Sequence, residues 1–241
     1  MRTDVLGVGF DPVTMNMAVE KGISLCQSGK AAYVVTPNPE IVWESRKNAQ
    51  LRDVLNSADL VLADGVGITF AAGILKTPLP EKVAGIDFAE NLISRMEALG
   101  LRLYLFGGRP GIAEKAAYNL RAKYPKLIIC GTHDGYFEDS APIVSDINAS
   151  GADAVFVCLG APKQELWIAE HRCELNVHLL AGLGGSLDVF AGEVKRAPEK
   201  WRKMKLEWLY RLMKQPRRIK RMAKLPLYAF AVIGRRFGCR L

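Results

Sequence analysis

The first candidate for chemistry is the segment Asp64-Gly65-Val66-Gly67, which follows the short apolar run Leu60–Ala63. A carboxylate that leaves a buried strand lies at the mouth of a site, where it can act as a general base towards a hydroxyl nucleophile. The alternative is that Asp64 caps the helix that follows, which is the usual role of Asp after a strand. Position alone leaves both interpretations open.

A second candidate is the loop Thr36-Pro37-Asn38-Pro39-Glu40. Two prolines fix its backbone, so the side chains of Thr36 and Asn38 are presented rigidly. A hydroxyl and an amide in such a loop are suited to hydrogen bonds with sugar hydroxyls. The alternative is an ordinary capped turn.

A third candidate is Gly160-Ala161-Pro162-Lys163-Gln164-Glu165, which joins a predicted strand to a helix that we expect to begin near Pro162. At such a helix start, Lys163 is placed to meet a phosphate and Gln164 to meet a sugar. The spacing by itself is a weak signal.

Glycine-rich strand exits add a possible nucleotide site, because glycine lets the backbone approach a ligand and amides at a helix start favour a diphosphate. None of these exits completes G-x-G-x-x-G, so a dinucleotide cofactor is unsupported. The glycines that we consider nucleotide contacts are Gly107, Gly108, Gly160, Gly184 and Gly185.

No metal or cofactor is predicted. His133, His171 and His178 have no ligand spacing, and no two aspartates stand in the D-x-D relation that often clamps a metal and a diphosphate. The charge of a departing diphosphate would then be met by backbone amides and by Lys or Arg.

The elements that must position these loops are short apolar strands, each followed by a helical pattern. Such near-continuous apolar runs are typical of parallel strands covered on both faces, and the alternation predicts a doubly wound, Rossmann-like, mostly parallel α/β sheet. Ligands of these sheets bind at the carboxyl ends of the strands. The predicted strands are Val5–Phe10, Ala32–Thr36, Leu60–Ala63, Leu101–Phe106, Leu127–Cys130, Ala154–Leu159 and Val177–Leu183. The predicted helix starts are Asp11-Pro12, Asp87 and Pro110.

Charge divides the chain into two predicted parts, a catalytic domain over residues 1–192 and a helical appendage over residues 193–241. The appendage holds 16 Lys and Arg against 3 Glu, a net charge of +13, whereas the preceding part is net −5. Trp201, Met204, Trp208 and Leu212 recur at helical spacing there. A basic amphipathic segment with tryptophan favours docking on an anionic membrane surface, with a solvated charged helical face as the alternative.

The cysteine pattern and the lack of a recognisable signal peptide or spanning segment indicate the cellular compartment that we expect. Five scattered cysteines without a C-x-x-C pair fit a reducing cytoplasm. The N-terminus does not resemble a signal peptide, and no apolar run approaches the roughly 20 residues of a spanning helix. We therefore expect a cytoplasmic protein that associates peripherally with the inner face of the cell membrane.

Taken together, these loops resemble those of the WecG/TagA/CpsF glycosyltransferases, glycosyltransferase family 26. The resemblance spans nearly the whole chain in the right order. The matching stretches are Thr36-Pro37-Asn38, Ala63-Asp64-Gly65-Val66-Gly67, Val83-Ala84-Gly85-Ile86-Asp87, Leu105-Phe106-Gly107-Gly108, Gly135-Tyr136-Phe137, Gly160-Ala161-Pro162-Lys163-Gln164-Glu165, Gly184-Gly185-Ser186-Leu187-Asp188, Glu207-Trp208-Leu209-Tyr210-Arg211 and Pro216-Arg217-Arg218.

The resemblance implies roles for particular residues. Asp64 matches the proposed catalytic base, and Asp188 and Tyr136 are candidate nucleotide contacts. Lys82 stands where the family usually carries arginine, which keeps the charge but loses the bidentate fork. The other matches are the pocket residues Thr36, Asn38 and Gln164 and the diphosphate-binding arginines Arg211, Arg218 and Arg221.

The implied activity is an inverting, metal-independent transfer of N-acetylmannosamine from its UDP donor to undecaprenyl-diphosphate-linked N-acetylglucosamine, in a β-1,4 linkage. This is an early step of wall teichoic acid synthesis. A different UDP-sugar donor within the same family is the first alternative, and a homo-oligomer is possible. An alternative of another class is a nucleic-acid-binding protein with a basic tail, but the chain lacks a helix-turn-helix or aromatic RNA-binding signature.

Overall fold

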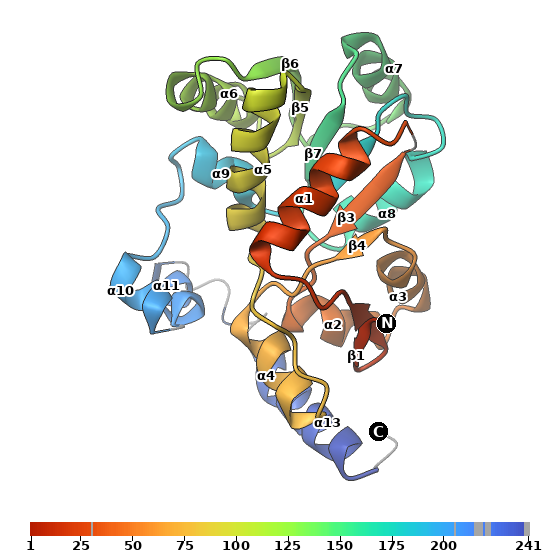
Figure 1. Cartoon of the computed structure of the whole chain (residues 1–241), viewed down its shortest axis with the longest axis vertical. Coiled ribbons are helices and arrows are strands. Elements are labelled where there is room, and N and C mark those ends of the chain that lie inside the picture. The colour runs from red at the N-terminus through yellow and green to blue at the C-terminus, as the bar shows by residue number, and fades with distance from the viewer. Residues whose placement is uncertain (30, 205, 215–218, 220–222, 239–241) are drawn as a thin grey trace.

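A six-stranded parallel sheet forms the centre of the computed structural model (Figure 1). The structure describes residues 1–29, 31–204, 206–214, 219 and 223–238. From edge to edge, the sheet contains β4 (Leu60–Val61), β3 (Ala32–Val35), β8 (Leu179–Gly182), β7 (Ala154–Cys158), β5 (Arg102–Gly107) and β6 (Ile128–His133). The predicted α/β class with a doubly wound parallel sheet is confirmed.

The central strands β3, β8 and β7 are buried along their whole length because helices cover both faces of the sheet. Along β7, Val155 and Val157 pack into one core cluster, whereas Ala154 and Phe156 pack into the other. The first cluster contains side chains of α2 (Pro39–Ser45), α3 (Ala49–Asn56), α4 (Val66–Ile74), α7 (Ala141–Ser150) and α8 (Lys163–His171). The second contains side chains of α1 (Met15–Cys26), α5 (Gly85–Leu99), α6 (Ile112–Lys123) and α9 (Ser186–Phe190).

The expected first strand of the sheet, Val5–Phe10, is wrong. The structure splits this segment into β1 (Thr3–Val5) and β2 (Val8–Phe10), which pair with each other antiparallel and outside the parallel sheet. The turn between them has φ of 55° at Leu6 and 94° at Gly7. A two-residue turn with both φ values positive matches the twist of a hairpin, but leucine gives no sequence signal for it.

Helix starts also differ from the predicted ones by a few residues. Asp11 does not cap α1: Thr14 does, and Asp11 instead accepts a hydrogen bond from the backbone N–H of Val61 at 2.8 Å. Asp87 lies in the first turn of α5, and α6 begins two residues after Pro110. The predicted alternation of strands and helices is nevertheless present along the chain.

The C-terminal part forms α10 (Glu199–Lys203), α11 (Glu207–Lys214) and α13 (Lys224–Arg236). The helical spacing from Trp201 to Leu212 is therefore interrupted between two short helices, rather than continuous. None of the helices that the structure describes is long and apolar enough to span a membrane. The division of the chain at residue 192 stays a prediction.

Helix α13 lies beside α4 and packs against α2 and α4 (Figure 1). Tyr228 is buried in the same core cluster as α4, and its hydroxyl donates a hydrogen bond to the carbonyl of Gly67 at 3.2 Å. Lys224 pairs with Glu44 of α2 at 3.0 Å. Part of the basic appendage therefore packs into the hydrophobic core of the sheet domain.

Candidate functional site

A cavity of about 470 Å³ lies at the carboxyl edge of the sheet. Its position follows from the connections: β3 continues into α2 on one face, while its neighbour β8 continues into α9 on the other. Loops that leave adjacent strands towards opposite faces separate and leave a crevice between them. Eight of the predicted site residues line this cavity: Thr36, Asn38, Asp64, Gly160, Gln164, Gly184, Gly185 and Asp188.

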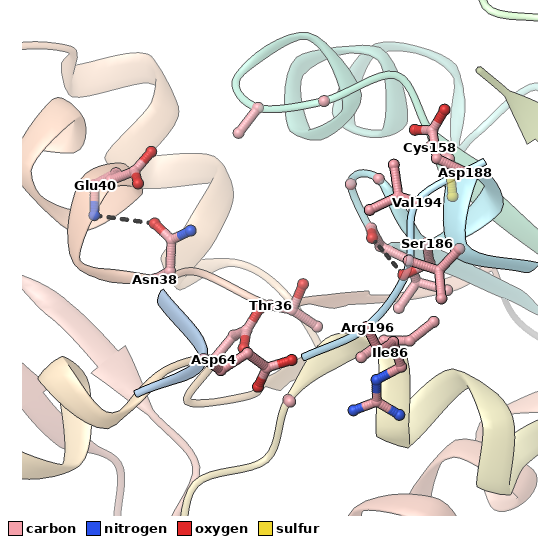
Figure 2. Close-up of a pocket in the computed structure, with 18 of the residues that line it drawn as sticks. Thr36, Asn38, Glu40, Asp64, Ile86, Cys158, Ser186, Asp188, Val194 and Arg196 are labelled. Carbon is pink, nitrogen blue, oxygen red and sulfur yellow. Dashed lines mark hydrogen bonds between the residues drawn. The ribbon is translucent and has the colours of Figure 1, made fainter. Parts of the chain in front are cut away.

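Asp64 follows β4, and Figure 2 shows its carboxylate pointing into the pocket beside Thr36. Its backbone N–H donates to the carbonyl of Pro37 at 3.3 Å, which ties the loop after β4 to the loop after β3. The N-cap of α4 is Gly65, with φ of 99°, so Asp64 does not cap that helix. Asp64 is therefore not the N-cap residue of α4, and its side chain lines the cavity.

Thr36 and Asn38 both have structural contacts as well as a place on the cavity wall. The Thr36 hydroxyl, which is buried, donates to the carbonyl of Gly182 at 2.9 Å and joins the ends of β3 and β8. The side-chain oxygen of Asn38 accepts from the backbone N–H of Glu40 at 2.9 Å and of Ile41 at 3.0 Å, so it caps α2 (Figure 2). The capped-turn alternative is correct for Asn38 and does not remove it from the cavity.

Gln164 lines the cavity and belongs to a short chain of hydrogen-bonded polar groups. Its carbonyl oxygen accepts from the backbone N–H of Gly184 at 2.9 Å, and its amide donates to Glu165 at 2.9 Å. The Glu165 side chain is fully buried, and burial raises the pKa of its carboxyl group above the ordinary value. Gln164 thereby couples the loop after β7 to the loop after β8.

The predicted nucleotide contacts fall into two groups. Gly160, Gly184, Gly185 and Asp188 line the cavity, with Asp188 in the first turn of α9. The remaining four, Gly107, Gly108, Tyr136 and Lys163, do not line it. Their role in nucleotide binding stays a prediction.

This second group forms a cluster of its own next to the cavity. Lys163 donates to the carbonyl of Gly135 at 3.0 Å and lies 4.1 Å from the ring centre of Phe137. Gly135 in turn donates to the carbonyl of Gly108 at 2.8 Å. Gly107 must be glycine, because its φ is 127° and a Cβ there would lie 2.4 Å from the carbonyl oxygen of Cys158.

Lys82 lies outside the 470 Å³ cavity, where it pairs with Glu207 of α11 at 3.4 Å. Arg218 and Arg221 lie outside the described residues, as does the side chain of Arg211. The predicted contacts of these arginines with a diphosphate stay predictions.

The structure adds residues that the sequence did not single out. Lys195, Arg196 and Lys214 bring positive charge to the cavity, and Tyr210 and Glu207 of α11 complete the wall. The only sequence signal for the cations was the overall charge of residues 193–241.

Arg196 is held on α5 by Asp87 at 2.8 Å and Glu90 at 3.8 Å. Figure 2 shows it on the side of the pocket near Ile86. The described lining side chains carry three cations against four carboxylates, Glu40, Asp64, Asp188 and Glu207. The cavity wall alone is therefore not strongly positive.

Two other features bear on the chemistry. Cys158 lines the cavity, but burial raises the pKa of its thiol to about 12, so it is not a thiolate nucleophile near neutral pH. Within the described part of the chain, no three His, Cys, Asp or Glu side chains are grouped to hold a metal ion.

Comparisons with known proteins agree with one another. The model of the glycosyl transferase WecG/TagA/CpsF family matches residues 3–240. An N-acetylglucosaminyldiphosphoundecaprenol N-acetyl-beta-D-mannosaminyltransferase of Bacillus spizizenii is 37% identical over 204 residues, which cover 85% of this chain and 79% of the relative. A protein of the same name from Staphylococcus aureus strain MW2 is 34% identical over 234 residues, which cover 96% of this chain and 92% of the relative.

Proposed function

Because the chain belongs to the WecG/TagA/CpsF glycosyltransferase family, we propose that it transfers N-acetylmannosamine from UDP-N-acetylmannosamine to N-acetylglucosaminyldiphosphoundecaprenol. The acceptor and the transferred sugar are those in the names of the Bacillus and Staphylococcus relatives. The product would carry a β-1,4 linkage and would enter wall teichoic acid synthesis. The observation that carries the proposal is the position of Asp64, a carboxylate inside a cavity framed by glycine-rich strand exits.

In this mechanism Asp64 is the general base. The 4-hydroxyl oxygen of the acceptor N-acetylglucosamine attacks C1 of the donor sugar while its proton passes to the Asp64 carboxylate. The bond between C1 and the UDP oxygen breaks as the new bond forms. Attack from the face opposite the leaving group converts the α-linkage of the donor into a β-linkage.

The leaving UDP is anionic, and we propose that it is stabilised without a metal ion. The backbone amides after β7 and β8 border the cavity together with Lys195, Arg196 and Lys214. These three cations are outnumbered by the carboxylates of the wall, so additional positive charge is required. Arg211, Arg218 and Arg221 of the appendage are the proposed source.

The acceptor is a lipid, so the protein must reach it at a membrane. We propose that the basic appendage docks the enzyme on the anionic inner face of the cell membrane. Its charge of +13 over residues 193–241 supports this placement.

The test is direct. The protein is incubated with a short-chain lipid-diphosphate-N-acetylglucosamine and a panel of UDP-sugars, with and without EDTA, and product masses are read. We expect one product, from UDP-N-acetylmannosamine, in equal amount with EDTA. A product from another UDP-sugar alone would change the donor, a loss with EDTA would require a metal, and no product from any donor would refute the transfer.

A further inference from the structure

A second hollow, of about 310 Å³, opens between α4, α11 and α13 and is here called the apolar groove. Its walls are mainly hydrocarbon. Its apolar lining includes Phe70, Ile74, Trp208, Leu225, Val232 and Ile233.

The side chains at the floor of the apolar groove are buried, whereas those at its rim are exposed to solvent. Tyr228 and Val232 are buried, and the hydrogen bond from Tyr228 to Gly67 fixes α13 on α4 beneath the groove. At the rim, Phe70 is 70% exposed, Trp208 44% and Ile233 43%. Large apolar side chains in such a cluster gain free energy when an apolar ligand covers them.

The charged and amide side chains of the groove gather where it meets the catalytic cavity. Asn38, Glu40, Asp64 and Glu207 line both spaces. The fifth, Lys82, lines the groove alone and pairs with Glu207 at 3.4 Å. A ligand that fills the groove therefore has one end beside the proposed general base, and that end must be polar.

We propose that the apolar groove binds the isoprenoid chain of the lipid acceptor next to its diphosphate. This inference rests on the proposed function and adds a site to it. An acceptor lying across the junction has its hydrocarbon between α4 and α13, and its sugar in the cavity beside Asp64. An ordinary membrane lipid in the groove would put its headgroup in the place of the acceptor sugar, which disfavours it as the resident ligand.

The experiment uses the full chain in detergent-free solution with short acceptors, so that vesicle binding does not contribute. N-acetylglucosamine diphosphate is attached to a methyl group or to a chain of one, two or three isoprene units. In the wild type, we expect the KM for the acceptor to fall at least about tenfold from methyl to three units, because buried methylene groups each favour binding.

Phe70→Ser tests the groove, and Phe230→Ser is the matched control. Both phenylalanines are exposed, 70% and 68%, and lie on helices, but Phe230 is not among the lining residues. We expect Phe70→Ser to lose roughly tenfold in this chain-length advantage, and Phe230→Ser to keep it. An unchanged advantage in Phe70→Ser, or a wild type indifferent to chain length, would overturn the proposal.

A binding measurement tests the groove independently of the proposed sugar transfer. Farnesyl diphosphate and inorganic diphosphate are titrated into the same three proteins by calorimetry. Preferential binding of farnesyl diphosphate that weakens only in Phe70→Ser supports the groove even if no sugar is transferred. No preference for the farnesyl compound, together with a monomer–dimer change in Phe70→Ser on sedimentation, would show that a second copy covers the groove and would reject the proposal.

Discussion

At the scale of single residues, two carboxyl groups beside the cavity have opposite surroundings. Asp64 lines the cavity at the end of β4, whereas Glu165 is fully buried under it and bonded to Gln164. A general base must be ionised and reachable, and burial favours the neutral form of an acid. The accessible position of Asp64 supports its proposed role as the base, and for the buried Glu165 we propose a positioning role.

Replacing Asp64 by Asn removes the proposed proton acceptor and keeps the shape of the side chain. We expect turnover to fall by about 10²–10⁴ while UDP binding and the far-UV spectrum stay unchanged. Asp53→Asn, on the exposed surface of α3, is the matched control and should turn over like the wild type. Near-normal turnover in Asp64→Asn would remove this residue from the mechanism.

Because the carboxyl group of Glu165 is buried, we predict that the free energy of unfolding depends on pH. Its pKa is raised in the folded state, so the folded protein binds the proton more tightly than the unfolded chain does. The free energy of unfolding then falls as pH rises above about 4.3, by up to ~1.4 kcal/mol per pH unit, until the folded-state pKa is passed.

The measurement is urea unfolding at pH 5 and pH 8. Glu165→Gln cannot ionise, and its amide oxygen can still accept from Gln164. We therefore expect the variant to lose less stability between the two pH values than the wild type. Glu138→Gln, at an exposed position, should keep the wild-type difference. Equal pH dependence in all three proteins would show that Glu165 does not titrate as argued.

At the scale of elements, α4 packs closely against the loop after β3, and this contact holds the proposed catalytic carboxylate of Asp64 in place. A Cβ at Gly67 would lie 2.6 Å from Cγ of Pro39, whose ring is rigid. The same helix holds Gly73, around which no atom lies within 4 Å of an added Cβ among the described residues. Gly67 and Gly73 therefore lie on the same helix but differ in the space that is available to an added Cβ.

Gly67→Ala should push α4 away from Pro39 and move Asp64 with it. We expect a loss of about 1–3 kcal/mol in the free energy of unfolding and a clear fall in turnover. Gly73→Ala should be neutral or stabilising by up to about 1 kcal/mol, since alanine is the better helix former. Thermal unfolding and turnover of both variants decide the matter; similar behaviour of the two would contradict the role given to the Gly67 contact.

At the scale of the whole molecule, the appendage packs into the core and also carries the basic side chains that we propose for membrane docking. Tyr228, Ala231 and Val232 of α13 belong to the core of the sheet domain, while Lys200 and Arg202 of α10 are exposed. Removal of the entire appendage would therefore strip core side chains, and its effect on activity would mix unfolding with loss of docking. Charge reversal on the surface is the cleaner probe.

The double reversal Lys200→Glu with Arg202→Glu should weaken co-sedimentation with anionic vesicles by roughly an order of magnitude or more, at about 1 kcal/mol per cation near the surface. Lys21→Glu with Lys126→Glu reverses the same charge on the exposed surface of the sheet domain and should sediment like the wild type. Binding of the wild type should weaken as salt rises, because exposed charges are screened within about 10 Å at 0.1 M. Salt-independent binding, or equal loss in both double variants, would refute docking through the appendage.

Sequence by itself determined the element types and most of the loops that meet at the cavity. Apolar runs such as Ala154–Cys158 and glycine or proline at strand exits are local signals, and they placed Asp64, Gln164 and Asp188 at carboxyl ends of strands. Since parallel strands present those ends at one edge, a common site followed from the fold class alone. The exception was the first predicted strand, because the Leu6-Gly7 turn carries no ordinary turn residue at Leu6.

Only the tertiary structure decided which loops share the cavity. The pairing of β3 with β8 joins segments that are far apart in the chain, and it brings Thr36 against Gly182 while Gly107 and Gly108 fall in a neighbouring cluster. Folding of the appendage back on α4 and α5 likewise brought Arg196 and Lys214 to the wall and created the apolar groove. These contacts depend on strand order and helix packing over long sequence separations, for which a local pattern of residues carries no information.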